Sequence, residues 1–127
     1  MTSFDAQITF LPSTDLEASR EFYGSVLGLE EVIDQGSCLV FKVTDEAFVG
    51  MCQRDDSAPS MHVMFTFVLD DVDGWCEEMG ERGVVFDTEP QPNPTYGIYH
   101  AFFKDPTGNL LEIQRFDDPG WVRRDNA

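Results

Sequence analysis

The segment DPTGNLLEIQRF, residues 105–116, places one acid, Glu112, in an alternating run that is otherwise suited to a strand. A carboxylate at such a position can ligate a metal, carry a proton, or sit as a polar group at a wet edge. The chain has two histidines, His62 and His100, whose imidazoles also bind metals and move protons near neutral pH. These three residues define the candidate chemistry: divalent-metal binding, or acid–base work on a small molecule.

The first half of the chain predicts one strand, one helix and three further strands. AQITFLPS is extended and partly alternating, and TDLEASREFYGSVLGLEE carries apolar residues at helical spacing. Thr14 with Glu17 fits a capping box at the start of the helix, and Gly28 fits its end. The runs EEVIDQGSCLVFKV and AFVGMCQ, interrupted by the turn signals DQG and TDE, predict the remaining strands.

The second half repeats this order. HVMFTFVL predicts a strand, DDVDGWCEEMGERG a helix ending at Gly83, VVFDTE a strand, and YGIYHAFFK with NLLEIQRF a hairpin. Aligning the helix starts pairs Asp15 with Asp71, an offset of 71 − 15 = 56. Aligning the last strands pairs residues 53–54 with 114–115, an offset of 114 − 53 = 61. The longer proline-rich segment DTEPQPNPTYG explains the difference and predicts an irregular, exposed loop near a pocket.

We therefore predict an α+β fold: a single domain over residues 1–127, with module 1 at about 7–55, module 2 at about 61–116 and a tail at 117–127. Two βαβββ modules would form one cup-shaped, mostly antiparallel sheet assembly with the helices outside. Strand alternation decides which side chains face the cup. We expect the helix side to hold Phe65, Phe67, Leu69, Leu111 and Ile113, and the cup to receive Met64, Thr66, Val68, Leu110, Glu112 and Gln114.

The charge balance excludes several partners. Eight basic and 24 acidic side chains give a formal net charge of −16, which repels phosphate backbones and anionic lipid surfaces. We therefore predict no nucleic-acid and no membrane partner, and the acidity favours solubility, a high-salt cytoplasm or attraction of cationic ligands. The start MTSFDAQITF lacks the features of a signal peptide, so a cytoplasmic location is expected. Cys38, Cys52 and Cys76 show no C-x-x-C spacing and are expected to be reduced.

The segments DLEASREFYGSVLGL, VLDDVDGW and FFKDPTGNLLEIQRF resemble the vicinal oxygen chelate superfamily. That superfamily contains glyoxalases, bleomycin-resistance proteins, fosfomycin-resistance enzymes and ring-cleaving dioxygenases. The resemblance extends from about Gln7 to Phe116, and it implies paired βαβββ modules and, commonly, a homodimer. It does not fix the reaction, because one fold supports many functions.

The resemblance also implies where a metal would bind. Metal-dependent members usually place one ligand in the first and one in the last strand of each module, typically His, Glu, His and Glu. These positions map onto Ile8, Met51, Met64 and Glu112, and a one-residue shift would replace Ile8 by Thr9. Isoleucine has no donor atom and thioether sulfur suits soft ions, so we predict no standard divalent-metal site and no cofactor.

The histidines do not restore such a site in an obvious way. His62 precedes Met64 by two residues on the same strand face, about 7 Å away, which is too far for direct replacement. His100 lies in the strand that pairs with the strand of Glu112, and its side depends on how many residues the DPTGN turn leaves unpaired. A hydrogen-bonded histidine, a ligand contact and a metal ligand all remain open for His100.

For Glu112 three roles also remain open: a polar group inherited from a metal-binding ancestor, a ligand contact, and a general acid or base. Burial of a carboxylate among apolar groups is costly unless it is paired, which makes its partners informative. In a metal-free enzyme, protein donors would have to stabilise an enolate. The predicted ligand-binding set comprises Phe10, Met51, Met64, Thr66, Tyr96, Tyr99, His100, Phe102 and Glu112, of which Glu112 is the catalytic candidate.

Two functions follow from this set. The first is a small-molecule-binding protein of the glyoxalase/bleomycin-resistance type, with an apolar and aromatic cup and no metal dependence. The second is a small-molecule lyase or isomerase that uses Glu112 as a general base, which requires Glu112 and a histidine to converge. The loss of three of four ligand positions favours the first. A ligand-free structural dimer would instead require the cup to be filled by its own side chains.

Overall fold

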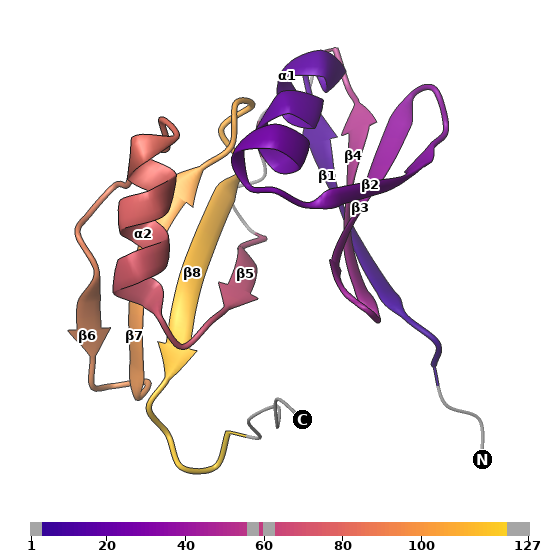
Figure 1. Cartoon of the computed structure of the whole chain (residues 1–127). Helices are drawn as coiled ribbons and strands as arrows, with labels where there is room; N and C mark the ends of the chain where they lie inside the picture. The colour runs from indigo at the N-terminus through magenta and orange to yellow at the C-terminus, as the bar shows by residue number, and fades with distance from the viewer. Residues whose placement is uncertain (1–3, 56–58, 60–62, 122–127) are drawn as a thin grey trace.

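The computed structural model describes residues 4–55, 59 and 63–121, which form two modules lying side by side (Figure 1). Module 1 consists of β1 (Gln7–Ser13), α1 (Leu16–Arg20), the π-helix η1 (Glu21–Val26), β2 (Glu30–Asp34), β3 (Cys38–Thr44) and β4 (Ala47–Gln53). Module 2 consists of β5 (Phe65–Val68), α2 (Val72–Glu81), β6 (Gln91–Asn93), β7 (Ile98–Lys104) and β8 (Leu110–Phe116). The predicted α+β fold with two βαβββ modules is confirmed.

Each module forms its own four-stranded sheet, with the orders β1-β4-β3-β2 and β5-β8-β7-β6. The first strand of a module pairs in parallel with its last strand, and the other pairs are antiparallel. This topology matters for chemistry because residues far apart in sequence become neighbours. Thr66 lies opposite Glu112 in module 2, and Phe10 lies opposite Gly50 in module 1.

The two main helices begin in the same way. The side chain of Asp15 accepts a hydrogen bond from the backbone N–H of Ala18 at 3.1 Å, and Asp71 accepts one from that of Gly74 at 2.9 Å. An aspartate N-cap satisfies a backbone donor that the first helical turn leaves unpaired. The equivalence of Asp15 and Asp71 is thus confirmed, whereas the prediction that Thr14 caps the first helix is wrong.

The strand registers correct the alignment of the two modules. Leu11 and Leu39 both lie opposite Met51, and Phe67 and Ala101 both lie opposite Ile113. The first strands are therefore offset by 67 − 11 = 56, as the helices are, and the last strands by 113 − 51 = 62. The predicted last-strand offset of 61 is wrong by one residue, and a one-residue slip moves every side chain to the other face.

A single hydrophobic core joins the helix-facing sides of both sheets. It includes Tyr23, Phe41 and Met51 from module 1 and Phe103 and Ile113 from module 2. Phe65 and Phe67 pack against it, as predicted, and Trp75 does so from α2. Leu69 follows β5 and is 40% exposed, so the prediction that it lies on the helix side of the core is wrong.

Polar contacts between the modules flank this core. The Tyr23 hydroxyl donates to Asp105 Oδ2 at 2.8 Å, and Asn109 Nδ2 donates to the backbone carbonyl of Pro12 at 2.8 Å. Arg82 Nη1 donates to the carbonyl of Val26 at 3.0 Å. The bond of Tyr23 holds η1 beside the β7–β8 turn, and Figure 1 shows α1 near the start of β8.

The segment after α2 differs from the prediction. VVFDTE does not form a strand: within it Phe86 makes one isolated bridge to Phe103, and β6 lies further on, at Gln91–Asn93 inside the proline-rich segment. Pro92 is tolerated there because β6 is an edge strand, where a residue without an N–H breaks no ladder. Part of the predicted loop therefore completes the sheet.

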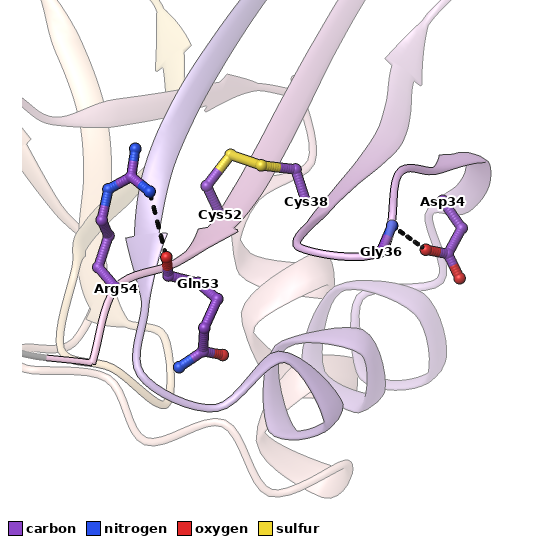
Figure 2. The surroundings of a disulfide bond; sticks show 6 residues. All are labelled: Asp34, Gly36, Cys38, Cys52, Gln53 and Arg54. Atoms are coloured by element: carbon purple, nitrogen blue, oxygen red, sulfur yellow. Dashed lines mark hydrogen bonds between the residues drawn. A yellow bond between two sulfur atoms is a disulfide. The ribbon is translucent and has the colours of Figure 1, made fainter.

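Cys38 and Cys52 form a disulfide, which corrects the expectation that all three cysteines are reduced. They lie directly opposite each other on the antiparallel strands β3 and β4, with a Cα–Cα distance of 4.1 Å (Figure 2). Facing positions on neighbouring strands bring two side chains within bonding reach. Cys76 on α2 is the free cysteine of the described residues.

Candidate functional site

Each sheet has one side covered by its helix and one side without it, which we call the open face. In β8, Leu111 and Ile113 are core residues, so Glu112 and Gln114 lie on the open face. In β7, Ala101 and Phe103 are core residues, so His100 and Phe102 lie on the open face too. The side of His100, which sequence left undecided, is settled because Lys104 pairs with Leu110 and five residues, 105–109, form the turn.

The turn itself is built by one carboxylate. Asp105 Oδ1 accepts hydrogen bonds from the backbone N–H groups of Thr107, Gly108 and Asn109, at 3.1, 3.0 and 2.8 Å. Gly108 has a φ of +100°, a backbone conformation that side-chain-bearing residues rarely adopt. Asp105 and Gly108 thus hold the register that sets His100 beside Glu112.

Glu112 is the centre of a buried polar cluster on the open face of module 2. It is 2% exposed, and its Oε1 accepts a hydrogen bond from Thr66 Oγ1 at 2.8 Å. Its Oε2 lies 2.6 Å from Nδ1 of His100, which is 7% exposed. A buried carboxylate is stable only when such bonds replace its lost hydration.

Gln114 completes the cluster, although it was not among the predicted ligand-binding residues. With the amide nitrogen turned toward the carboxylate, the orientation that satisfies both partners, Gln114 lies 3.0 Å from Glu112 Oε1 and 3.2 Å from Oε2. The signal was present in the sequence, because a residue two places after Glu112 must share its face. We refer to Thr66, His100, Glu112 and Gln114 as the polar cluster.

Aromatic and apolar groups surround the polar cluster. The rings of Phe102 and His100 meet edge to face with centroids 4.9 Å apart. Met64 and Val68, which flank Thr66, are 45% and 44% exposed. Thr66, His100, Phe102 and Glu112 of the predicted ligand-binding set therefore come together, and Met64 lies at their margin.

The remaining members of the predicted set lie elsewhere. Met51 is fully buried in the core, so the prediction that it faces the cup is wrong; Gly50 holds the corresponding place. Tyr99 faces α2, where its hydroxyl donates to Asp73 at 2.6 Å, and it is not part of the open face.

Tyr96 is 70% exposed in the turn between β6 and β7. Phe10 lies on the open face of module 1 and is 50% exposed. His62 falls outside the described residues.

Asp73 contributes to raised pKa values of two neighbours in a shallow cavity of about 610 Å³ between α2 and residues 86–90. Its hydrogen bond raises the pKa of Tyr99 above the usual value. Burial, with a smaller contribution from Asp73, raises the pKa of the Cys76 thiol to about 11. Cys76 therefore remains a thiol at neutral pH and is a poor nucleophile.

A larger cavity of about 990 Å³ lies between the edges of the two sheets. Met64, Thr66 and Val68 line it from β5 and its approach, and Gln7 and Thr9 line it from β1. Trp75 and Trp121 add aromatic surface. Its size falls within the range of small-molecule sites, and Thr66 connects it directly to the polar cluster.

The donor set does not fit the metal site that the superfamily implies. With the corrected offset, the four positions are Ile8, Gly50, Met64 and Glu112, so Glu112 alone offers an oxygen. The described residues contain no group of three or more histidine, cysteine or acidic side chains arranged to hold a metal. The oxygens of Glu112 are engaged by Thr66, His100 and Gln114 instead.

Comparisons with known proteins agree with this architecture. Residues 6–113 match the family described as the glyoxalase/bleomycin resistance protein/dioxygenase superfamily. The uncharacterized protein YraH of Bacillus subtilis (strain 168) is 26% identical over 115 residues, covering 80% of this chain and 90% of YraH.

Solved structures show the same fold. A glyoxalase/bleomycin resistance protein/dioxygenase from Nocardioides matches with a TM-score of 0.77 at 20% identity, covering 98% of this chain and 91% of that one. TnmS3, an antibiotic binding protein from Streptomyces sp. CB03234, matches with a TM-score of 0.74 at 27% identity, covering 91% of this chain and 98% of TnmS3. No helix of the described residues is long and apolar enough to cross a membrane.

Proposed function

Because the chain belongs to the glyoxalase/bleomycin resistance protein/dioxygenase superfamily, we propose that it binds a small, mainly apolar or aromatic molecule at the open face of module 2. The observation that carries this proposal is the polar cluster, in which a buried Glu112–His100 pair is set among apolar side chains. A few fixed polar groups on an apolar surface are the usual composition of a small-molecule site.

Three further observations support binding rather than metal-dependent catalysis. The 990 Å³ cavity reaches the polar cluster through Thr66. Three of the superfamily's four metal positions, Ile8, Gly50 and Met64, offer no suitable ligand for hard divalent ions. TnmS3, which has the same fold, is an antibiotic binding protein. An uncharged or cationic ligand suits a protein whose formal net charge is −16.

A thermal-shift screen tests the proposal. Purified protein, treated with EDTA, is compared with samples that contain Zn²⁺, Ni²⁺, Mn²⁺ or Mg²⁺ and with samples that contain aromatic small molecules or antibiotics, all at fixed salt. We expect stabilisation by at least one organic compound and none by the metals, because a ligand that binds the folded state raises its melting temperature. Stabilisation by a metal that disappears in Glu112→Ala would contradict the proposal.

The second candidate function, a lyase or isomerase with Glu112 as general base, draws on one observation: Glu112 and a histidine lie within hydrogen-bond reach. In that case Glu112→Gln, which keeps the shape of the side chain, would abolish turnover while the circular-dichroism spectrum and melting temperature stay close to wild type. Unchanged turnover of a substrate by Glu112→Gln would exclude this role for Glu112.

We also propose that the protein is a homodimer. Large apolar side chains on the open face of module 1 are half-exposed in the single chain, notably Ile8, Phe10 and Ile33. Several exposed large apolar side chains on one face of a sheet commonly mark an interface. Light scattering after size-exclusion chromatography should give twice the chain mass of 14.4 kDa. A monomer at all concentrations would overturn this proposal without affecting the ligand site.

A further inference from the structure

The hydrogen bonds of the polar cluster distinguish the roles of its two ionisable residues. A carboxylate has about four lone-pair positions and accepts only. Glu112 Oε1 is approached by Thr66 and Gln114, and Oε2 by His100 and Gln114, so both oxygens have two partners. Glu112 is therefore engaged within the protein and has little capacity left for a bound molecule.

His100 is in the opposite situation. Its Nδ1 faces Glu112 at 2.6 Å, and no hydrogen bond of the described residues involves its Nε2. Every fully buried side-chain nitrogen or oxygen atom of the described residues has a hydrogen-bond partner. Because Nε2 has no such partner among these residues, it is not fully buried. The imidazole places Nε2 away from the carboxylate that holds Nδ1. Nε2 is thus the polar atom of the cluster left to meet a ligand.

The carboxylate also sets the tautomer of His100. When the imidazole is neutral, a carboxylate that accepts its hydrogen bond at Oε2 requires the imidazole proton on Nδ1, and Nε2 then carries a lone pair. A lone pair selects a ligand that donates a hydrogen bond. The Phe102 ring, 4.9 Å from His100, and the exposed Val68 and Met64 favour an apolar or aromatic body around that donor.

We infer that His100 Nε2 is the anchor of the site, that Glu112 is a positioning residue acting through His100, and that the ligand is an uncharged aromatic molecule with a hydroxyl group. This inference rests on the proposed binding function and deepens it by naming the ligand class. Thr66 and Gln114 hold Glu112 in place, and the hydroxyl of the ligand donates to Nε2. An anionic ligand is disfavoured both by the Nε2 lone pair and by the net charge of −16.

The first test needs no ligand. Long-range ¹⁵N–¹H correlation spectra of the full chain at about pH 8, where an ordinary histidine is neutral, report which ring nitrogen carries the proton. We expect the Nδ1–H tautomer for His100 in the wild type and a mixture of tautomers in Glu112→Gln. An Nε2–H tautomer, a doubly protonated ring, or a spectrum unchanged by Glu112→Gln would overturn the assigned roles.

The second test uses a matched pair of probes, 2-naphthol and 2-methoxynaphthalene, which differ in the hydroxyl donor. We expect fluorescence titration to show about tenfold tighter binding of 2-naphthol to the wild type, the effect of one hydrogen bond. The preference should vanish in His100→Phe and be reduced in Glu112→Gln, with folding checked by circular dichroism.

The outcomes distinguish failure of this inference from failure of the proposed binding function. Equal affinity of the wild type for both probes would overturn the hydroxyl-bearing ligand class while leaving a binding site. Absence of binding by either probe would overturn the ligand class together with support for binding at this face. A preference that survives in His100→Phe would overturn the anchor role of Nε2.

Discussion

The open faces of the two modules share one backbone plan and differ in chemistry. In module 2, His100 and Gln114 lie side by side across β7 and β8, next to the pair formed by Glu112 and Thr66. In module 1 the equivalent positions, offset by 62 and by 56 residues, hold Cys38 and Cys52, and Gly50 and Phe10. A disulfide and an aromatic ring over a glycine thus replace the polar cluster.

The difference shows how a duplicated unit can keep one fold with one polar site. A Cβ on Gly50 would lie 2.3 Å from Phe10 Cδ1, so the ring occupies the space that a side chain at the Glu112 position would need. Module 1 secures its open face by a covalent bond and packing, and module 2 by hydrogen bonds to a buried carboxyl group. Substitutions at these equivalent positions should therefore lower the free energy of unfolding for different physical reasons in the two modules.

The largest expected effect is in module 2. His100→Phe removes one partner of a buried pair and should lower the free energy of unfolding by about 3–5 kcal/mol, because the buried carboxyl group of Glu112 loses that partner. The double variant His100→Phe/Glu112→Leu should recover most of this loss, since an apolar pair needs no charge compensation. Urea unfolding followed by circular dichroism measures both. A double variant as unstable as the single one would contradict the buried-charge account.

The corresponding change in module 1 is removal of the disulfide. Cys38 and Cys52 are 14 residues apart, and a loop of about 15 residues predicts a loss of about 3 kcal/mol on reduction by the chain-entropy estimate. Urea unfolding with and without dithiothreitol measures it, with Cys38→Ala/Cys52→Ala as the control that reductant cannot affect. Identical unfolding midpoints of oxidised and reduced wild type would show that the bond does not secure this face.

A smaller effect is expected where the modules meet. Tyr23→Phe removes the hydrogen bond to Asp105 and should cost about 1–3 kcal/mol in urea unfolding. Burial, aided by Asp105, raises the pKa of Tyr23 well above 10, so the folded state favours the neutral phenol. The corresponding stability is complete below about pH 10, the unfolded value, and is lost as pH rises toward the folded pKa. Tyr23→Phe should flatten this alkaline decline, and an unchanged decline would assign it to other groups.

The smallest expected effect is at Gly50. Gly50→Ala forces the half-exposed Phe10 ring to turn aside, which should cost about 1 kcal/mol, at the lower end of overpacking effects. Phe10→Ala/Gly50→Ala should be no less stable than Phe10→Ala alone, because the obstacle is absent. A Gly50→Ala penalty that persists without the ring would place the constraint in the backbone instead.

Much of this architecture follows from the sequence. Helical spacing, turn signals and the repeat predict both βαβββ modules, and alternation places Thr66 and Glu112 on one face. The side of His100 did not follow, because it depends on a hairpin register that only pairing of Lys104 with Leu110 fixes. Tyr99 was predicted to face the cup because the same hairpin register decides its side of the strand.

Two other errors arose from neglected constraints. Residues 53–54 were matched with 114–115 because both pairs are Gln-Arg. The helix offset of 56 and the strand pairings together require a last-strand offset of 62, so Met51 was predicted on the wrong face of its strand. The spacing of the cysteines along the chain alone does not predict the disulfide. Pairing the two predicted strands around the TDE turn sets residue 38 against residue 52. Disulfides are uncommon in a reducing cytoplasm, and the cytoplasmic location stays a prediction.

We propose that ligand binding belongs to the polar cluster of module 2. The most direct measurement is the melting-temperature rise produced by an organic ligand from the thermal-shift screen, in two matched double variants. We predict that His100→Phe/Glu112→Leu folds but loses this rise, and that Cys38→Ala/Cys52→Ala, altered at the equivalent face of module 1, keeps it. A full rise in the first variant, or a loss confined to the second, would contradict the claim.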